Sequence, residues 1–388
     1  MESKRFLGHL WRVVLAAFVF HALLLPSLFA QLSTPDHLAD SGFWPTQNSV
    51  SRDDYVGSQM CASCHANKFA TQIHTSMGKT SAHASDAEIL QQYTKLKFSV
   101  GKYKYEIRRD GAQSVYSVTD GTRTLSYPLV WAFGTGRVGQ SYLFKKEDGN
   151  LYEARVTYFE TLKSLHFTPA RALESPKDLE EAMGRRVPAD EIERCFACHT
   201  TESTIGTKFD EQKLMFGVAC EACHGGGAKH VAAAKVASMA GTPDEARGTI
   251  FNAAQLEPAD TVDFCGACHA TFWDVKLIGG KGVSTAKSQP YRLEQSKCWG
   301  KGDARLTCPA CHDPHKQLET EVAAYDRYCV NCHTASVKKT DDHAGKACPV
   351  ATKECSSCHM PKVDVPEMHY AFTDHRIRVV HAGDAYPE

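Results

Sequence analysis

The sequence lacks an excess of charge of either sign. Its 388 residues include 44 Lys and Arg against 45 Asp and Glu, and no basic block stands out. Nucleic-acid-binding proteins carry clustered basic residues, so nothing here indicates a nucleic-acid partner. The chain also lacks the strongly polar composition of a disordered protein, because 43% of its residues are apolar.

Beyond the N-terminus the sequence has no apolar run long enough to span a membrane. Near the start, Lys4 and Arg5 precede an apolar stretch that ends at about Ala30 in small residues, a pattern typical of an export signal. Residues 1–30 are predicted to be a cleaved signal peptide. The alternative is an uncleaved anchor, because the stretch approaches the roughly 20 residues that cross a bilayer. Both alternatives predict a periplasmic or extracellular location.

Cysteine is abundant and strictly patterned. Fourteen of the 16 cysteines fall in seven copies of C-x-x-C-H. In chain order, the first to seventh motifs contain Cys61 and Cys64, Cys195 and Cys198, Cys220 and Cys223, Cys265 and Cys268, Cys308 and Cys311, Cys329 and Cys332, and Cys355 and Cys358. The histidines that follow them are His65, His199, His224, His269, His312, His333 and His359.

This motif matches the chemistry of covalent haem attachment. Two thiols three positions apart can add to the two vinyl groups of one haem, and the adjacent histidine then lies under the iron as its proximal ligand. Disulfide-type redox pairs do not require a histidine after every second cysteine. Zinc ribbons use two C-x-x-C pairs for each metal, which leaves one of seven pairs over. The sequence therefore predicts seven covalently attached haem c groups, each with its iron.

Two cysteines remain outside the motifs, Cys298 and Cys348. An oxidising compartment favours a disulfide between them. The alternative is two separate thiols, because sequence does not show whether their Cα atoms come within bridging distance.

The motifs are unevenly spaced. One lies near the N-terminus and six lie between Cys195 and His359. Such density leaves little room for a conventional core, so we expect a mainly α multihaem cytochrome c fold, in which short helices and loops wrap a haem-packed core. The predicted division is a first-haem segment at 52–90, a β-rich insert at 95–170 and a six-haem cytochrome domain at 188–388.

The long gap between the first two motifs predicts a small antiparallel β-module. Aromatic and β-branched residues alternate with polar ones from Phe98 to Phe159, and Asp-Gly pairs at 110–111, 120–121 and 148–149 predict turns between strands. The stretch Gly134–Gly139 matches G-x-G-x-x-G, but a strand-like segment follows it instead of a helix, which favours a glycine-rich turn over a dinucleotide site. Helices are predicted at 188–194, leading into the second motif, and at 228–240, which is rich in alanine.

Ten histidines outside the motifs and the signal compete for seven distal positions on the irons. Five are predicted distal ligands: His74, His230, His315, His369 and His375. A second imidazole makes a haem low-spin and suited to electron transfer. His315 follows His312 by three residues, too few to wrap one haem, so we expect it to serve a neighbouring haem.

The remaining candidates are less strongly indicated. An iron-ligand role and a structural role are equally consistent with three histidines, His83, His166 and His343. Two others, His37 and His381, lie near chain ends, which are usually solvated. Met77 and Met368 are thioether alternatives, for which packing is the favoured role.

The haem half of the chain resembles multihaem cytochromes related to hydroxylamine oxidoreductase and its tetrahaem cytochrome electron acceptor. The resemblance rests on the stretch from Gly217 to Gly227 with His230 following, on Cys308–His315, and on Cys355–Lys362. It implies a mainly helical haem wrap with parallel and perpendicular haem pairs, and it supports His230 and His315 as distal ligands. The enzymes of this class carry eight haems, and their pentahaem nitrite reductase relatives use C-x-x-C-K, which this chain does not contain.

Three functions fit the sequence. The favoured one is an exported heptahaem electron-transfer protein whose partners are redox proteins, either quinol-linked or other cytochromes. The second is an oxidoreductase in which one open-face haem acts on a small nitrogen or sulfur compound, with His83, His166, Arg171 or Tyr158 as polar helpers. The third is a subunit of an extracellular or membrane-associated electron conduit, assembled as a membrane-associated complex or a homo-oligomer. Whether the chain is an enzyme is left open.

Overall fold

The computed structural model describes residues 44–46, 51–169, 176–205, 208–300, 306–333, 348 and 350–387. All of them belong to Gly42–Glu388, one of the two compact units of the chain. The predicted signal peptide or anchor lies outside the described residues, as do His37, Arg171 and His343. Within the described ranges, no helix has the length and apolar character needed to cross a membrane.

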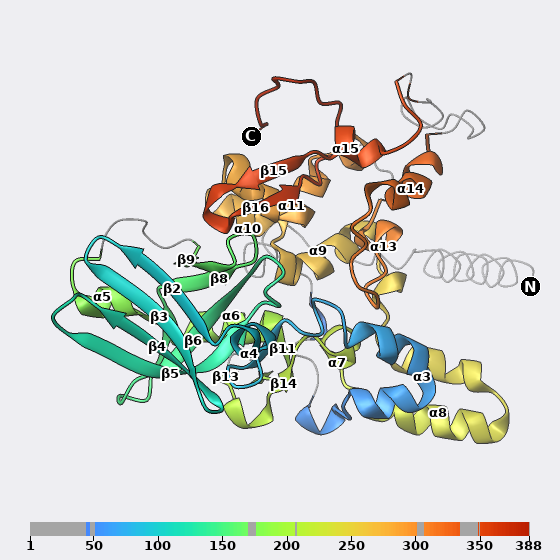
Figure 1. Ribbon diagram of the computed structural model, residues 1–388. Helices are drawn as coiled ribbons and strands as arrows, with labels where there is room; N and C mark the ends of the chain where they lie inside the picture. Colours follow the sequence, from blue (N-terminus) through green and yellow to red (C-terminus); the bar gives the residue numbers. More distant parts are fainter. Residues whose placement is uncertain are drawn as a thin grey trace, which may run out of the picture. The chain divides into compact units, whose positions relative to one another are not determined.

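The largest element is a ten-stranded antiparallel sheet (Figure 1). Its strands are β1 (Ser81–His83), β2 (Lys95–Val100), β3 (Tyr103–Asp110), β4 (Gln113–Thr119), β5 (Thr124–Phe133), β6 (Gly139–Lys145), β7 (Leu151–Ala154), β8 (Val156–Phe159), β9 (Ser164–Phe167) and β10 (Gly184–Arg186). They follow the order β10-β7-β6-β5-β4-β3-β2, with β1 paired to β5 and β8 paired to β6 and β9. Strand β9 also packs against β2, where Ser164 Oγ donates a hydrogen bond to the Lys97 carbonyl at 3.0 Å. The sheet therefore curls back toward its own edge.

This sheet corrects the predicted fold class. A mainly α fold with a small β-module is wrong, because the strands form one large curled sheet that reaches from Ser81 to Arg186. The sheet takes β1 from before residue 95 and β10 from after residue 170. Each of these strands has only three residues, too few to show an alternating pattern in the sequence. The division into 52–90, 95–170 and 188–388 stays a prediction.

The predicted turns are confirmed. The Asp-Gly pair at 110–111 connects β3 to β4, and Gly111 adopts the left-handed conformation, with φ of 59°, that glycine allows at no steric cost. The pairs at 120–121 and 148–149 connect β4 to β5 and β6 to β7. Gly134–Gly139 joins β5 to β6, which confirms the predicted glycine-rich turn. A further turn at Gly101, between β2 and β3, was not predicted.

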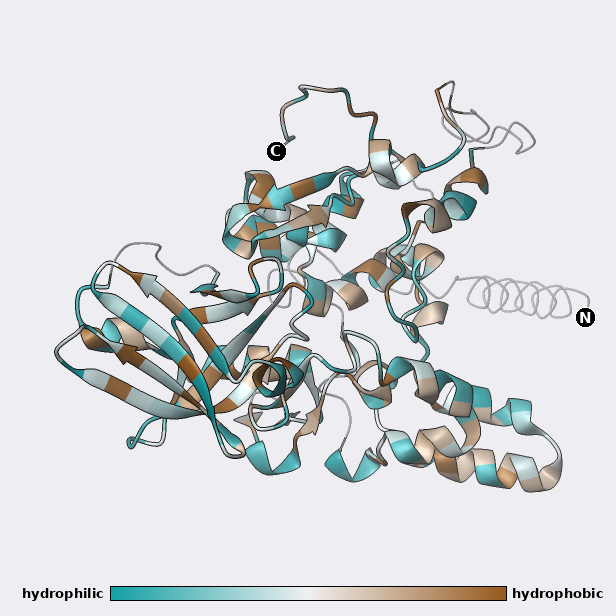
Figure 2. Ribbon diagram, viewed as in Figure 1, coloured by the Kyte–Doolittle hydropathy of each residue, from teal (hydrophilic) through white to brown (hydrophobic). Residues whose placement is uncertain are grey.

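Alternation along the strands builds the core of the sheet, and Figure 2 shows hydrophobic and hydrophilic residues alternating along several of them. On β3, Tyr103, Tyr105 and Ile107 are buried while Lys104 is exposed. Tyr116 on β4 and Tyr142 on β6 are completely buried in the same cluster. Burying each such side chain stabilises the fold by roughly 1.5–3 kcal/mol, so the sheet has a core made by its own side chains.

Each of the seven C-x-x-C-H motifs has its first cysteine on a helix. The helices are α3 (Ser58–Gln72), α4 (Glu88–Gln92), α5 (Leu179–Met183), α6 (Ala189–His199), α7 (Cys220–His224), α8 (Ala228–Ala240), α9 (Pro258–His269), α10 (Phe272–Leu277), α11 (Gln289–Glu294), α12 (Lys297–Gly300), α13 (Cys308–Cys311), α14 (Asp326–Val330) and α15 (Cys355–His359). Most are short, and 3₁₀ turns connect them: η1 (Arg52–Asp54), η2 (Glu211–Lys213), η3 (Pro243–Thr249), η4 (Ala253–Gln255), η5 (Gly282–Lys287), η6 (Val322–Tyr325) and η7 (Pro366–Met368).

Three two-stranded ladders complete the described structure. They pair β11 (Thr200–Thr201) with β14 (Met215–Phe216), β12 (Thr204–Ile205) with β13 (Lys208–Phe209), and β15 (Lys362–Val365) with β16 (Tyr370–Thr373). The last ladder leads the chain from the seventh motif into its C-terminal segment.

The two helices predicted in the haem half are confirmed. Helix α6 begins after Pro188, whose fixed φ suits a helix start, and it ends at the motif histidine His199. Helix α8 spans the alanine-rich stretch and ends at Gly241 in the left-handed conformation. Because side chains three positions apart lie on the same side of a helix, both thiols of a motif can face one haem.

Candidate haem-attachment sites

Motifs that are far apart in the sequence come together in pairs. Four pairs of thiols from different motifs lie close enough for each thiol to shift the pKa of the other: Cys61 with Cys220, Cys198 with Cys268, Cys265 with Cys308, and Cys329 with Cys355. The packing of the helices agrees with three of these thiol pairs: α3 packs against α7, α13 packs against α9, and α14 packs against α15. The Cys198 thiol also lies 3.6 Å from the Ala267 carbonyl, inside the fourth motif.

Two further pairs of thiols lie near enough to shift each other's pKa, and their proximity places the motifs in a row. Cys223 of the third motif interacts with Cys265 of the fourth, and Cys311 of the fifth interacts with Cys329 of the sixth. The motifs thus follow the spatial order one, three, four, five, six, seven, and the second motif lies beside the fourth. This order differs from the sequence order at one place, the position of the second motif.

Three motif histidines face a second imidazole across a fixed gap. The ring centroids of His65 and His230 are 6.3 Å apart, those of His224 and His315 are 6.1 Å apart, and those of His312 and His375 are 6.2 Å apart. Two metal–nitrogen bonds of about 2.0 Å, plus about 1.1 Å from each nitrogen to its ring centre, would separate the centroids by about 6.2 Å. By contrast, the rings of His83 and Trp131 pack directly on each other, and their centroids are 4.5 Å apart. The three wider pairs have the spacing of two axial ligands on one metal.

Where these rings make a hydrogen bond, they use Nδ1, so Nε2 is left to bind a metal. The Nδ1 atom of His224 donates to the Phe251 carbonyl at 2.9 Å, and that of His375 donates to the Thr373 carbonyl at 3.0 Å. The same atom makes the polar contact in the other histidines: His199 with Thr80, His230 with Thr249, His359 with the Arg378 carbonyl and His315 with Asp313. A metal-bound histidine characteristically uses its second nitrogen in this way, which fixes the ring and leaves Nε2 for the metal.

The charge state of the deep imidazoles suits metal binding. Burial lowers the pKa of His199 and His312, and it lowers the pKa of His375 to about 4. These rings are therefore neutral at pH 7, the form that offers a lone pair to a metal. The donor set, its spacing and its protonation all fit haem iron.

The structure brings His230, His315 and His375 to motif histidines but places the other two predicted distal ligands elsewhere. His74 is exposed, in the turn that follows α3. His369 packs edge-on against His166 at 4.5 Å and against Phe159 at 4.8 Å, on the sheet. Its backbone carbonyl accepts a hydrogen bond from Thr161. Their role as ligands stays a prediction.

The polar helpers proposed for an open-face haem, as far as the structure describes them, have other partners, and Arg171 lies outside the described residues. His83 packs between Trp131 and Phe216, and the Tyr158 hydroxyl donates to Glu160 within the sheet. His381 is exposed and makes a contact with Asp384. Met368 ends η7, and Met77 contributes its backbone carbonyl to a hydrogen bond with Val218.

The structure does not join Cys298 to Cys348 by a disulfide. Cys298 lies in α12, and Cys348 is exposed. The predicted bridge is therefore not present.

Glu221 clamps the first and third motifs together, a role that sequence reasoning missed. Its carboxylate is 2% exposed and accepts hydrogen bonds from the backbone N–H groups of Val56 and Gly57 at 2.8 Å and of Gly227 at 2.9 Å. A Cβ at Gly227 would meet Glu221 Oε1 at 3.3 Å and Val56 Cγ2 at 2.9 Å, which explains the glycine. A charged residue between the two cysteines of a motif is the signal that could have revealed the clamp.

Removing this clamp should destabilise the protein measurably. We expect Glu221→Ala to lower the free energy of unfolding by about 3 kcal/mol, because three buried N–H groups lose a charged acceptor. Chemical denaturation followed by circular dichroism measures the loss. The matched control is Glu245→Ala on the exposed turn η3, which should change stability by less than about 0.5 kcal/mol. If the two variants had the same denaturation midpoint, the Glu221 carboxylate would not hold these segments together.

Two carboxyl groups, one buried and one half-buried, lie beside the fourth and fifth motifs. Asp263 on α9 is 8% exposed, and Glu294 ends α11, which packs on α9. Burial, followed by the charges of Asp260 and Asp274, raises the pKa of Asp263 to about 7. Burial, followed by the charge of Asp263, raises the pKa of Glu294 to about 8.

These carboxyl groups should make the protein less stable as the pH rises from about 4 to about 8. Because their pKa values are higher in the folded state, the folded protein binds more protons than the unfolded chain between about pH 4 and pH 8, so stability falls as pH rises through this window. We expect Asp263→Asn to reduce the fall between pH 5 and pH 8 by about 2.5 kcal/mol, because that interval covers about two pH units of the window. Unfolding measured at pH 5 and pH 8 checks this; an unchanged difference between the two pH values would contradict it.

Comparison with known proteins agrees with the motif chemistry. A family model described as cytochrome c554 and c-prime matches residues 155–225, which include the second and third motifs. The match supports a c-type cytochrome with covalently bound haem. No curated protein sequence matches the chain.

Among solved structures, the chain is similar to the outer cell wall cytochrome OcwA, with 16% sequence identity and a TM-score of 0.41. That similarity covers 84% of this chain and 80% of the other. The relation to hydroxylamine oxidoreductase stays a prediction.

Proposed function

We propose that this chain is an exported heptahaem c-type cytochrome that transfers electrons along its haems. The observation that carries the proposal is the set of three imidazole pairs with centroid separations of 6.1–6.3 Å. Each pair joins a motif histidine to a histidine from a distant part of the sequence, as two axial ligands of one iron require. Two imidazoles occupy both faces of an iron and favour electron transfer over chemistry on a substrate.

The chain's residues supply attachment and orientation. The fourteen motif thiols would hold seven haems, the motif histidines would ligate the irons, and His230, His315 and His375 would ligate the first, third and fifth irons from the other side. When bound, each haem supplies an iron that accepts and releases one electron. The carbonyls and hydroxyls that bind Nδ1 atoms hold the imidazoles in place, and burial keeps His199 and His375 neutral.

The row of motifs supports a directed relay. Cys64 and His65 of the first motif are exposed, and so is Cys358 of the seventh, at the other end of the row. Redox partner proteins, either quinol-linked or other cytochromes, would therefore dock at the two ends. Export would follow from the N-terminal signal at residues 1–30, and association with a membrane complex or another copy of the chain would extend the row.

The second candidate function is an oxidoreductase acting on a small nitrogen or sulfur compound. It is favoured by the second and fourth motifs, where His199 and His269 face no other imidazole at metal spacing among the residues that the structure describes. An open face on either iron would admit a small ligand.

Spectroscopy separates these functions. The protein, expressed with its own signal in a host that matures c-type cytochromes, should give a low-spin EPR spectrum that cyanide and nitrite leave unchanged. A high-spin signal from one haem that disappears on cyanide binding would contradict the pure relay and support the oxidoreductase.

A further inference from the structure

The imidazole of His312, the fifth motif histidine, has a tyrosine hydroxyl as its hydrogen-bonding partner. His312 Nδ1 lies 3.5 Å from the Tyr325 hydroxyl, and the two rings are T-shaped, with centroids 5.6 Å apart. The same hydroxyl donates a hydrogen bond to the Glu319 backbone carbonyl at 2.9 Å. Because that bond uses the hydroxyl proton, the Tyr325 oxygen is the acceptor in the contact with His312, and the imidazole N–H is the donor.

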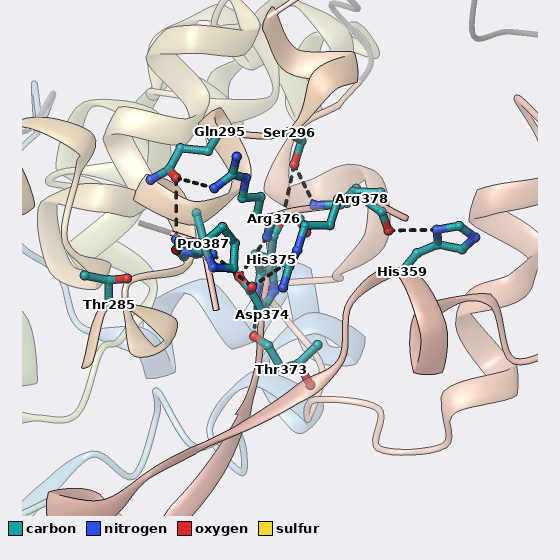
Figure 3. Close-up of polar contacts among 12 residues, drawn as sticks. Thr285, Gln295, Ser296, His359, Thr373, Asp374, His375, Arg376, Arg378 and Pro387 are labelled. Carbon is teal, nitrogen blue, oxygen red and sulfur yellow. Dashed lines mark hydrogen bonds and ion pairs between the residues drawn. The ribbon is translucent and has the colours of Figure 1, made fainter. Parts of the chain in front are cut away.

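Two other motif histidines use main-chain acceptors at the same position. Figure 3 shows His359, the seventh motif histidine, beside the Arg378 backbone carbonyl, which accepts a hydrogen bond from its Nδ1 at 2.9 Å. The Phe251 carbonyl is the acceptor for His224 at the third motif. Changing one side chain does not remove a main-chain acceptor, whereas the hydroxyl of Tyr325 belongs to the side chain. At the fifth site, therefore, the identity of one side chain decides whether the imidazole has this acceptor.

The backbone at Tyr325 is held by the residue that follows it. Asp326 Oδ2 accepts a hydrogen bond from the Glu354 N–H at 2.7 Å, and Oδ1 accepts one from the Cys355 N–H at 2.8 Å, where the seventh motif begins. Tyr325 is the N-cap residue of α14, and Cys329 of the sixth motif lies on the same short helix. Tyr325 therefore stands where the fifth, sixth and seventh motifs meet, and these contacts keep its hydroxyl at one place relative to the imidazole.

We propose that Tyr325 is a positioning residue that lowers the reduction potential of the haem attached at Cys308 and Cys311. The proposal rests on the function proposed above, in which His312 ligates the fifth iron. An imidazole that donates its second N–H becomes a more basic ligand, and a more basic ligand favours the oxidised iron, whose charge is higher. The fifth motif lies between the fourth and the sixth in the row, so this potential bears on every electron that crosses the row.

Tyr325→Phe tests the proposal, because it removes the hydroxyl and keeps the ring. In a spectroelectrochemical titration of the full haem-loaded chain, we expect one component to shift toward the reduced state by about tenfold in its redox equilibrium, which is 59 mV for one electron. Tyr328→Phe is the matched control. The Tyr328 ring lies 6.2 Å from that of Tyr325, but its hydroxyl accepts a hydrogen bond from Arg327 at 2.7 Å instead of one from a motif histidine.

A second background assigns the shifted component to the fifth haem. His375→Ala should make that haem high-spin, so adding Tyr325→Phe to this variant should raise the potential of the high-spin haem itself. The proposal is overturned if the Tyr325→Phe titration matches that of Tyr328→Phe, if the component shifts toward the oxidised state, or if the double variant shifts only low-spin haems. The haem count and the low-spin spectrum of the wild-type protein report separately on the proposed function.

Discussion

His375→Ala should convert one low-spin haem into a high-spin haem that binds cyanide. The reason is geometric: His375 faces the motif histidine His312 at 6.2 Å, and its Nδ1 is held by the Thr373 carbonyl. Removing the second imidazole leaves one iron face open, so the high-spin EPR signal should correspond to about one haem in seven. His230→Ala and His315→Ala should each give the same result at the first and third sites.

The matched control for this change is His369→Ala. His369 lies six residues before His375, but its ring packs against His166 and Phe159 on the sheet. We expect no new high-spin signal from this variant. A high-spin signal in His369→Ala, with none in His375→Ala, would reverse the ligand assignment of the C-terminal segment.

Asp374→Asn should give the largest loss of stability of any single substitution considered. Asp374 is the carboxylate shared by the completely buried Arg292 and by Arg378. Removing one partner of a buried ion pair leaves the other charge uncompensated and typically costs about 3–5 kcal/mol. Denaturant titration of the haem-loaded protein, followed by circular dichroism, measures the change in the free energy of unfolding.

An exposed carboxylate on the same C-terminal segment provides the control. The Asp384 side chain is 48% exposed and contacts His381, so Asp384→Asn should change stability by less than about 0.5 kcal/mol. If Asp374→Asn were no more destabilising than Asp384→Asn, the buried pair would contribute little to the fold. The salt dependence should be small for Asp374, because buried pairs are poorly screened.

The attachment sites are readable from the sequence because their chemistry is local. Two thiols and a histidine within five residues specify one haem, and a short helix suffices to present them. Helix α8 was predictable for the same reason, since alanine favours helix at each position separately. The hairpin turns follow from Asp-Gly pairs, whose conformational preference is also local.

The pairing of the histidines and the size of the sheet were not predictable in this way. His369 and His375 stand in similar sequence surroundings, but the ladder of β15 and β16 directs one ring to the sheet and the other to the fifth motif. His65 and His230 meet because Glu221 brings distant segments together. Strands β1 and β10 exist because longer strands offer them edges. Each of these outcomes depends on packing between distant residues.

The pyridine haemochrome count per chain tests the central claim most directly. The seven C-x-x-C-H motifs predict seven haems on each polypeptide, retained under denaturing conditions because thioether bonds hold them. A count of seven supports the multihaem electron carrier described here. A count of three or fewer in protein matured by a competent host would contradict it.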